Sequence, residues 1–382
     1  MAKPLKLVAA NDSFAVLVAL GEVLAGKQAL FVTPPETNGK MPEIHGLPNE
    51  VPDNVALIVE SSGSTGTPKR IELSLPALMA SAEASLQRIG GPGQWLLALP
   101  ANYIAGAQVL IRSLVSDTQP VLMNTGVSFS AESFVRSALM MSGARRYTSL
   151  VPTQLNLLAD AANNDAAVLT ALKSFDAILV GGQAPRAATL EALRKHGVNI
   201  VVTYGMTETS GGCVYDGVAL AGVSVGLGDG EQIFVGGATM ANGLNDPFET
   251  NDIGFIDSDG KLVVSGRRDR VINSGGLKLS LDLVEEWARS QPNVLDAVAL
   301  PLENAKYGDS FICWVVIEEP DKNDIDHDLA VEALGKVAST AVWANVEALP
   351  LLPNGKTDLQ TLMQSFIDFQ ENLRQQRANG NI

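Results

Sequence analysis

Histidine is scarce in this chain. There are three, His45, His196 and His327, and their separation argues against a histidine metal site, which needs ligands at short, regular spacing. Residues 222–226 (Gly-Val-Ser-Val-Gly) match the Gly-x-Ser-x-Gly pattern of serine hydrolases, but a nucleophile elbow needs a helix directly after its serine. Residues 226–230 are typical of a turn instead, so a catalytic triad is not expected.

Cysteine and positive charge are also in short supply. The two cysteines, Cys213 and Cys313, lie a hundred positions apart without paired spacing, which favours free thiols in a reducing compartment. Lysine and arginine number 27 against 42 acidic residues, and the net charge of −15 argues against a nucleic-acid-binding surface. Small anionic ligands are not excluded, because they need only local positive charge.

No stretch of the sequence is long and apolar enough to suggest a membrane helix. The longest uncharged span, residues 89–111, contains Pro92 and Pro100 together with several glycines. Near the N-terminus, an apolar run at residues 14–20 is followed by Glu22 and by no small-residue cleavage pattern, so a signal peptide is not expected. These observations predict a cytoplasmic protein without membrane insertion.

The pattern of apolar runs indicates an α/β fold. Hydrophobic residues make up 46% of the 382 positions and charged residues 18%, as in globular proteins large enough for two domains. From residue 55, strand-like runs alternate with helical stretches of about a dozen residues, which indicates a mostly parallel sheet flanked by helices. The expected strands are residues 29–32, 55–59, 95–99, 121–123, 147–151, 177–180 and 200–203, and the expected helices include residues 14–24, 130–141 and 185–196. Ligands of such sheets gather at the carboxyl ends of strands.

The most distinctive stretch is a polar, glycine-rich loop at residues 61–70. It has almost no side chain to pack in a core, but it offers backbone N–H groups, hydroxyls and a lysine that can close on an anion. It is not a Walker P-loop, because Pro68 precedes Lys69 and a strand-like segment follows in place of a helix. A flexible polar hairpin is the alternative interpretation.

Further polar groups follow later strands. The strand at residues 200–203 ends in Tyr204-Gly205-Met206-Thr207-Glu208-Thr209, and a simple strand-to-turn junction would not need the carboxylate of Glu208. The other stretches of this kind are Val180-Gly181-Gly182-Gln183, Thr250-Asn251-Asp252, Gly266-Arg267-Arg268-Asp269, Ser274-Gly275-Gly276 and Leu352-Pro353-Asn354-Gly355-Lys356.

In this order, the loop and the later motifs resemble the adenylate-forming enzymes, the family of acyl-CoA synthetases, luciferases and peptide-synthetase adenylation domains. The resemblance covers nearly everything from residue 55 onward, and the part before it is shorter than in most members. It implies a large N-terminal domain (residues 1–268) with mostly parallel sheets flanked by helices. A small, mobile C-terminal α+β domain (residues 269–382) would carry the catalytic lysine.

The resemblance also implies a role for each motif residue. The phosphates of ATP would contact Ser62, Gly63, Ser64, Thr65, Gly66 and Lys69, and the adenine would contact Gly181, Gly182, Gln183 and Tyr204, with Gly205 also in the nucleotide site. Asp252 would bind the ribose, and Arg267 would contact the ribose or a phosphate. Thr207 would bind the α-phosphate and Glu208 would hold Mg²⁺. Lys356, presented at a loop tip by Asn354-Gly355, would be the lysine of the adenylation step.

The remaining implied roles concern the second half-reaction and the acid. Asp269 would be the hinge of the small domain, and Gly275 and Gly276 would let the backbone approach the pantetheine arm of coenzyme A. Tyr103 stands where the family has an aromatic residue or histidine that lines the acyl pocket, although it could equally be a core aromatic. Arg112 would suit a second carboxylate on the substrate if it faced the pocket, and would otherwise be a surface arginine.

The implied function is an ATP-dependent acid–CoA ligase that uses Mg²⁺. It would activate a small carboxylic acid as an acyl-adenylate and then form the CoA thioester. The compact form resembles the short bacterial ligases whose acid carries two carboxylates and a keto group. Alternatives are another aromatic acid–CoA ligase, a stand-alone adenylation enzyme that loads a carrier protein, and a non-catalytic two-lobed binding protein, for which Lys356 and Glu208 are hard to explain. Three departures from the family pattern, Arg70, Tyr103 and Asn251, have no assigned consequence.

Overall fold

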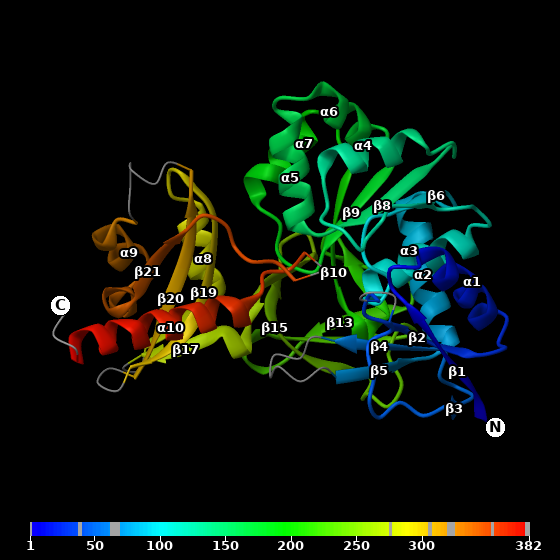
Figure 1. Cartoon of the computed structure of the whole chain (residues 1–382), viewed down its shortest axis with the longest axis horizontal. Coiled ribbons are helices and arrows are strands. Elements are labelled where there is room, and N and C mark those ends of the chain that lie inside the picture. The colour runs from blue at the N-terminus through cyan, green and yellow to red at the C-terminus, as the bar shows by residue number, and fades with distance from the viewer. Residues whose placement is uncertain are drawn as a thin grey trace.

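The computed structural model describes residues 2–36, 40–61, 69–274, 277–304, 308–318, 325–352 and 355–378. Figure 1 shows a large lobe that carries the N-terminus and a small lobe that carries the C-terminus. Three sheets form the large lobe, and the fourth sheet lies in the small lobe. The short helix η3 (Arg268–Arg270) connects the last strand of the third sheet to the first strand of the fourth. The division of the chain into two domains after residue 268 stays a prediction.

The first sheet has the strand order β3-β1-β2-β4-β5, with β1, β2 and β4 parallel. Its elements are β1 (Ala2–Ala9), α1 (Ser13–Leu24), β2 (Ala29–Thr33), β3 (Glu50–Pro52), β4 (Leu57–Ser61) and β5 (Lys69–Leu73). The sequence pattern predicted one strand and one helix before residue 55, and this was incomplete, because β1 and β3 are also present. β1 was missed because its apolar residues alternate with two lysines and a proline.

The second sheet has the order β12-β11-β10-β9-β8-β6-β7, and its strands from β6 to β10 run parallel. The strands are β6 (Gln94–Leu97), β7 (Val121–Leu122), β8 (Arg146–Leu150), β9 (Ala177–Gly181), β10 (Ile200–Met206), β11 (Gly211–Tyr215) and β12 (Val218–Ala219). The predicted parallel sheet is therefore confirmed, with antiparallel strands added at one edge.

Helices cover both faces of the second sheet, and apolar side chains of its strands pack on both sides. Trp95 and Leu97 of β6 pack into a core with α1, α2 and α3, whereas Leu96 between them packs into a second core with α4 to α7. The helices are α2 (Leu75–Ile89), α3 (Ile104–Val115), α4 (Ala131–Leu139), α5 (Pro152–Ala162), α6 (Ala166–Lys173) and α7 (Ala187–Lys195). β6, β8 and β9 are thus largely buried on both faces, whereas β10 is half-buried after Ile200.

The third sheet is an antiparallel meander, β13-β14-β15-β16. Its strands are β13 (Val223–Leu227), β14 (Gln232–Gly237), β15 (Phe248–Ile256) and β16 (Leu262–Arg267), with η2 (Asp229–Glu231) between the first two. Ser224 of the Gly-x-Ser-x-Gly pattern lies within β13 and no helix follows it directly, so the pattern does not form a nucleophile elbow.

The small lobe is a sheet with helices on both sides. Its strands are β17 (Val271–Ser274), β18 (Leu277–Ser280), β19 (Val294–Asn304), β20 (Gly308–Ile317) and β21 (Val342–Val346), and its helices are α8 (Leu281–Arg289), α9 (His327–Leu334), η4 (Lys336–Thr340) and α10 (Leu359–Ala378). Val284 of α8 packs on one face and Leu362 of α10 on the other. Of the helices in the described part of the chain, none combines the length and the apolar character needed to span a bilayer.

Candidate active site

The predicted adenine contacts gather where β9 and β10 end. Gly181 is the last residue of β9 and pairs with Thr203 of β10, so the two strand ends lie side by side. Only glycine fits here, because an added Cβ would lie 2.3 Å from Thr203 Oγ1. Gly182 and Gln183 follow and are exposed. This carboxyl edge therefore presents accessible backbone, as a flat ring requires.

Tyr204 and Asp252 join the second sheet to the third. The Tyr204 hydroxyl donates a hydrogen bond of 2.7 Å to Asp252 Oδ2. Asp252 stands opposite Arg267 in the β15–β16 ladder, and Arg267 Nη1 lies 3.5 Å from Asp252 Oδ1. Burial raises the pKa of Asp252, while the Tyr204 hydrogen bond and the Arg267 charge act in the opposite direction. Burial and the Asp252 charge raise the pKa of Tyr204, so its hydroxyl stays protonated and donates.

Asp269 shares Arg267 with Asp252. Arg267 donates two hydrogen bonds to Asp269, 2.8 Å from Nε and 2.6 Å from Nη2. These bonds hold the pKa of the Asp269 carboxyl below its usual value and that of Arg267 above it. The backbone N–H of Arg267 also donates to Asp282 of α8, at 2.9 Å. The predicted ribose-binding arginine is thus tied to the predicted hinge residue and to the small lobe.

Lys356 reaches this cluster from the small lobe. Between β21 and α10 the chain extends out of the small lobe toward β10 (Figure 1). A turn presents the lysine, in which the Leu352 N–H donates to the Lys356 carbonyl at 2.7 Å. Lys356 Cε lies 3.4 Å from the position of an ideal Cβ on Gly182. Burial, and then the positive charge of Arg267, lower the pKa of Lys356. Residues distant in sequence are therefore brought together from both lobes.

Thr207 and Glu208 begin η1 (Thr207–Thr209), directly after β10. Thr209 fixes this turn, because its hydroxyl accepts a hydrogen bond from the Met206 N–H at 3.0 Å and donates to the Gly211 carbonyl at 2.7 Å. The side chains of Thr207 and Glu208 are half-buried. The Glu208 carboxylate fits Mg²⁺, a hard cation that takes one or two protein carboxylates and fills its other positions with phosphate oxygens and water. The described residues contain no cluster of three or more metal-ligating side chains.

The predicted phosphate loop lies between β4 and β5. Its predicted contacts Ser62, Gly63, Ser64, Thr65 and Gly66 lie outside the described residues, as do Gly275 and Gly276. Lys69 begins β5 and pairs with Ser61 in the antiparallel ladder. The neighbouring Arg70 donates to Glu60 at 3.1 Å and to the His45 carbonyl at 2.7 Å. Arg70, a departure from the family pattern, thus fastens the base of the hairpin to the chain around His45.

Tyr103 and Arg112 lie far apart along α3. Tyr103 is the N-cap residue of α3 and is half-buried, and this burial raises its pKa. Arg112 has an exposed fraction of 3%, its guanidinium carbon lies 5.1 Å from the centre of the Trp95 ring, and its Nη2 lies 3.4 Å from the Tyr215 hydroxyl. Trp95 stands near the amino end of β6, away from the carboxyl edge. The structure does not bring Arg112 to the cluster around Asp252.

Two contacts between the lobes involve residues to which the motifs assign no role. The Thr153 hydroxyl donates to the Gly355 carbonyl at 2.7 Å, and Arg186 forms an ion pair of 3.1 Å with Asp296. The sequence contains one signal for Thr153 and Arg186. Each of these two residues stands at the start of a helix that follows a parallel strand, which is where ligands gather in such sheets.

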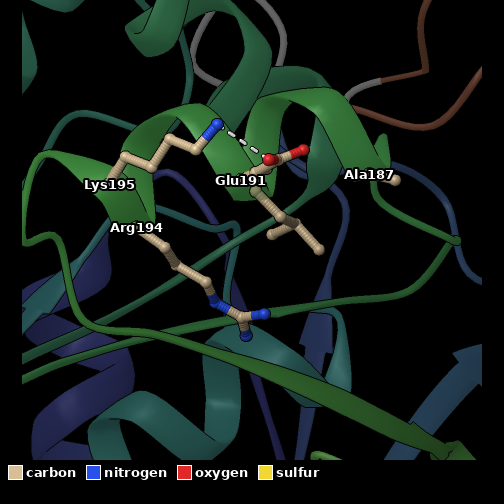
Figure 2. A pocket seen from close by; sticks show the side chains of 5 residues that line it. Ala187, Glu191, Arg194 and Lys195 are labelled. Atoms are coloured by element: carbon tan, nitrogen blue, oxygen red, sulfur yellow. Dashed lines mark ion pairs between the residues drawn. The ribbon is translucent and has the colours of Figure 1, made fainter.

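A shallow depression on the surface of α7 is separate from this cluster. Figure 2 shows the residues that line it, Ala187, Leu190, Glu191, Arg194 and Lys195. Glu191 and Lys195 pair with each other at 2.8 Å, one helical turn apart. No residue of the predicted site lines this depression, so it contributes nothing to the candidate site.

The sequence and the fold both have known counterparts. A family model described as "AMP-binding enzyme" matches residues 8–233. A probable 2-succinylbenzoate–CoA ligase of Mycobacterium tuberculosis (strain H37Rv) is 34% identical over 380 residues, covering 95% of this chain and 98% of that protein. A sulfoacetate–CoA ligase of Cupriavidus necator is 27% identical, covering 87% of this chain and 73% of that protein.

Among solved structures, the chain is similar to o-succinylbenzoate CoA synthetase from Bacillus subtilis. In complex with the acyl-adenylate intermediate OSB-AMP, that protein superposes with a TM-score of 0.72 at 21% identity, covering 93% of this chain and 87% of that chain. Its complex with ATP and magnesium ion superposes with a TM-score of 0.69, also at 21% identity, covering 93% of this chain and 88% of that chain. At this level of identity the likeness shows the fold, with its large N-terminal and small C-terminal domains.

Proposed function

Given that this chain belongs to the AMP-binding enzyme family and is an AMP-forming acid–CoA ligase, we propose that the acid it activates is 2-succinylbenzoate (o-succinylbenzoate). The observation that carries the proposal is the 34% identity to the probable 2-succinylbenzoate–CoA ligase across 95% of this chain and 98% of that protein. Such a match extends over nearly the whole length of both chains. The activity would place the protein in menaquinone synthesis.

The first half-reaction joins two anions, so it depends on positive charge and alignment more than on a base. The substrate carboxylate attacks the α-phosphorus of ATP, the new acyl–oxygen–phosphorus bond forms, and the bond to pyrophosphate breaks. Lys356 would place its ammonium beside the charge that develops at the α-phosphate, where Thr207 would donate a hydrogen bond. Mg²⁺ on Glu208 would supply further neutralisation of the phosphates when bound.

The nucleotide would be oriented by residues of both the second and the third sheets. Tyr204 and the backbone of Gly181–Gln183 would contact adenine, and Asp252 would accept hydrogen bonds from the ribose hydroxyls, supported by Arg267. The phosphate loop at residues 62–66, followed by Lys69, would enclose the β- and γ-phosphates. The proximity of Lys356 Cε to Gly182 supports an arrangement suited to this half-reaction.

In the second half-reaction, the thiol of coenzyme A attacks the acyl carbonyl, the thioester bond forms and AMP leaves. We propose that rotation at Asp269 withdraws Lys356 and opens the path for the thiol, with Gly275 and Gly276 beside the pantetheine arm. The position of Asp269 supports this role, because it lies in η3, between the last strand of the third sheet and the first strand of the small lobe.

The proposal is tested by measuring pyrophosphate release with ATP, Mg²⁺ and a panel of acids, with and without coenzyme A. We expect release with 2-succinylbenzoate to exceed that with benzoate and sulfoacetate, and thioester to form only when coenzyme A is present. A preference for sulfoacetate would support the second candidate, for which the 27% identity to a sulfoacetate–CoA ligase is the specific observation. Adenylate formation followed by acyl transfer to a carrier protein and never to coenzyme A would favour a carrier-loading enzyme, and no pyrophosphate with any acid would favour a binding protein.

A further inference from the structure

Two polar contacts join the large lobe to the small lobe around the turn that carries Lys356. The first is the hydrogen bond of 2.7 Å from Thr153 Oγ1 to the carbonyl of Gly355, the residue directly before Lys356. The second is the ion pair between Arg186 Nη2 and Asp296 Oδ2, at 3.1 Å. Thr153 and Arg186 belong to the large lobe, and neither touches the predicted nucleotide-binding residues in the contacts described above.

Thr153 lies at the start of α5, and side-chain hydrogen bonds hold this helix start in place as a platform for the turn. The Gln154 side chain accepts a hydrogen bond from the Val151 N–H at 3.2 Å and donates to the Ala98 carbonyl at 3.0 Å. The turn packs closely on this platform, since a Cβ added at Gly355 would lie 2.7 Å from Val151 Cγ2. The position of the Gly355 carbonyl is therefore set by a helix start that is hydrogen-bonded to Ala98, the residue directly after β6.

Asp296 is oriented within the small lobe before it meets Arg186. Its Oδ1 accepts hydrogen bonds from Arg289 Nε at 3.1 Å and from the Ala297 N–H at 2.9 Å, which leaves Oδ2 aimed at Arg186. Arg289 also forms an ion pair with Glu285, with 3.0 Å between Arg289 Nη2 and Glu285 Oε2. Arg186 and Asp296 side chains are each 25% exposed, so solvent screens their attraction less than it would at an open surface.

The same network reaches the segment between the lobes. Glu285 accepts a hydrogen bond from Arg270, at the end of η3, and Arg270 also pairs with Asp282. Asp282 in turn accepts the backbone N–H of Arg267 at 2.9 Å. A continuous set of ion pairs and hydrogen bonds therefore connects the Arg186–Asp296 contact to the predicted ribose-binding arginine.

We propose that Thr153 and Arg186 are positioning residues for the adenylation step. They dock the small lobe on the starts of α5 and α7, so that Lys356 is held beside Gly182 and Arg267. The inference rests on the proposed function, in which Lys356 acts in the first half-reaction and is absent from the second. Loss of either contact should therefore slow adenylate formation and leave thioester formation from supplied adenylate unaffected, because small misplacements of a charged group cost large factors in rate.

The kinetic test compares Thr153→Val, which removes the hydroxyl at similar volume, with Thr153→Ser, which keeps it. We expect kcat for pyrophosphate release to fall about tenfold in Thr153→Val and in Arg186→Gln, with the rate from supplied acyl-adenylate and coenzyme A within about twofold of wild type. Thr153→Ser should restore the rate. Arg194→Gln is the matched control, since Arg194 lies on the same helix but pairs with Asp216 inside the large lobe. Equal losses in both half-reactions, or no loss in either, would overturn the proposal.

A second readout does not depend on catalysis. Lys356 is half-buried in the docked arrangement, so its acetylation by an amine-reactive ester should be slow relative to exposed Lys6. We expect the ratio of the two acetylation rates, measured by peptide mass spectrometry, to rise severalfold in Thr153→Val and Arg186→Gln and to stay constant in Arg194→Gln. An unchanged ratio in the first two variants would contradict docking by these residues. Inactivity of the wild type with every acid would count against the proposed function and against a role of these residues in adenylation, whereas the labelling result would separately decide whether the two contacts dock the small lobe.

Discussion

The hydroxyl of Tyr204 donates a hydrogen bond of 2.7 Å to the carboxylate of Asp252, and this bond joins the second sheet to the third. Tyr204 comes from a parallel strand that ends at the carboxyl edge of the second sheet, and Asp252 comes from an antiparallel strand in which it pairs with Arg267. The bond orients an acidic side chain whose pKa is raised by burial, and the bond itself acts to lower that pKa. Tyr204 and Arg267 together thus fix the orientation of the Asp252 carboxylate.

Replacing Tyr204 with phenylalanine should weaken ATP binding. The substitution removes one donor to a largely buried carboxylate, a loss of about 1.5–3 kcal/mol for a hydrogen bond to a charged group. Because the Tyr204 bond lowers the pKa of Asp252, its removal raises that pKa further, so ATP affinity should fall at a higher pH as the solution is acidified. Calorimetric titration with a non-hydrolysable ATP analogue across pH checks both effects. Tyr103→Phe is the control, and equal affinities for the two variants at every pH would show that the bond is unimportant.

The alkaline limit of the adenylation rate should report on Lys356. Burial and the charge of Arg267 lower the pKa of Lys356, and the adenylation step needs its ammonium form. Pyrophosphate release should therefore begin to decline at a lower pH than the pKa of an ordinary lysine predicts. Lys356→Arg keeps the positive charge at all accessible pH values. Whatever its effect on the maximal rate, this variant should therefore show the decline in pyrophosphate release only at a higher pH. A decline at the same pH in wild type and variant would assign the titration to another group.

Arg112 should matter for stability more than for substrate binding. Its guanidinium stacks on Trp95 beneath the second sheet, and a desolvated cation–π contact contributes up to about 2 kcal/mol. We expect Arg112→Met to lower the free energy of unfolding by about 1–3 kcal/mol in urea titrations, with little change in KM for the acid. The exposed Arg136 of α4 is the control. The motif-based alternative, in which Arg112 binds a second carboxylate, predicts instead a KM that rises far more for a dicarboxylate than for a monocarboxylate analogue.

Gly181 should be intolerant of alanine. A Cβ there would lie 2.3 Å from Thr203 Oγ1 and 2.8 Å from the Thr203 carbonyl oxygen, which would separate the ends of β9 and β10 at the proposed adenine contacts. We expect Gly181→Ala to cost about 1–3 kcal/mol of unfolding free energy and to weaken ATP binding. Gly226→Ala, at a position where an added Cβ meets nothing within 4 Å, should change stability by less than about 0.5 kcal/mol. Similar stabilities for the two variants would contradict the close approach at Gly181.

Much of the large lobe could be predicted from sequence because its physical signals are local. β9 and the first residues of β10 are short apolar runs preceded by helical stretches, and helices cover both faces of their sheet, as that pattern indicates. The strand ends then bring Gly181 and Tyr204 to one edge, as the fold type requires. β1 was missed because a strand with one exposed face and two lysines carries a weaker signal.

The parts that could not be predicted depend on tertiary geometry. Arg112 lies nine residues after Tyr103, which is two and a half helical turns, so the two side chains leave α3 on opposite sides. The contacts of Thr153 with Gly355 and of Arg186 with Asp296 join positions separated by more than a hundred residues, and no local pattern encodes them. The hydrogen bond between Tyr204 and Asp252 is likewise long-range, although each residue was singled out by its own motif.

We propose above that Lys356, a lysine of the small lobe, completes a nucleotide site built by the large lobe. The most direct measurement compares the two half-reactions in Lys356→Ala, namely acid-dependent pyrophosphate release and CoA thioester formation from supplied acyl-adenylate. We predict that pyrophosphate release falls at least about a hundredfold while thioester formation stays close to that of the wild type. Unimpaired pyrophosphate release, or equal loss of both rates, would contradict this role for Lys356.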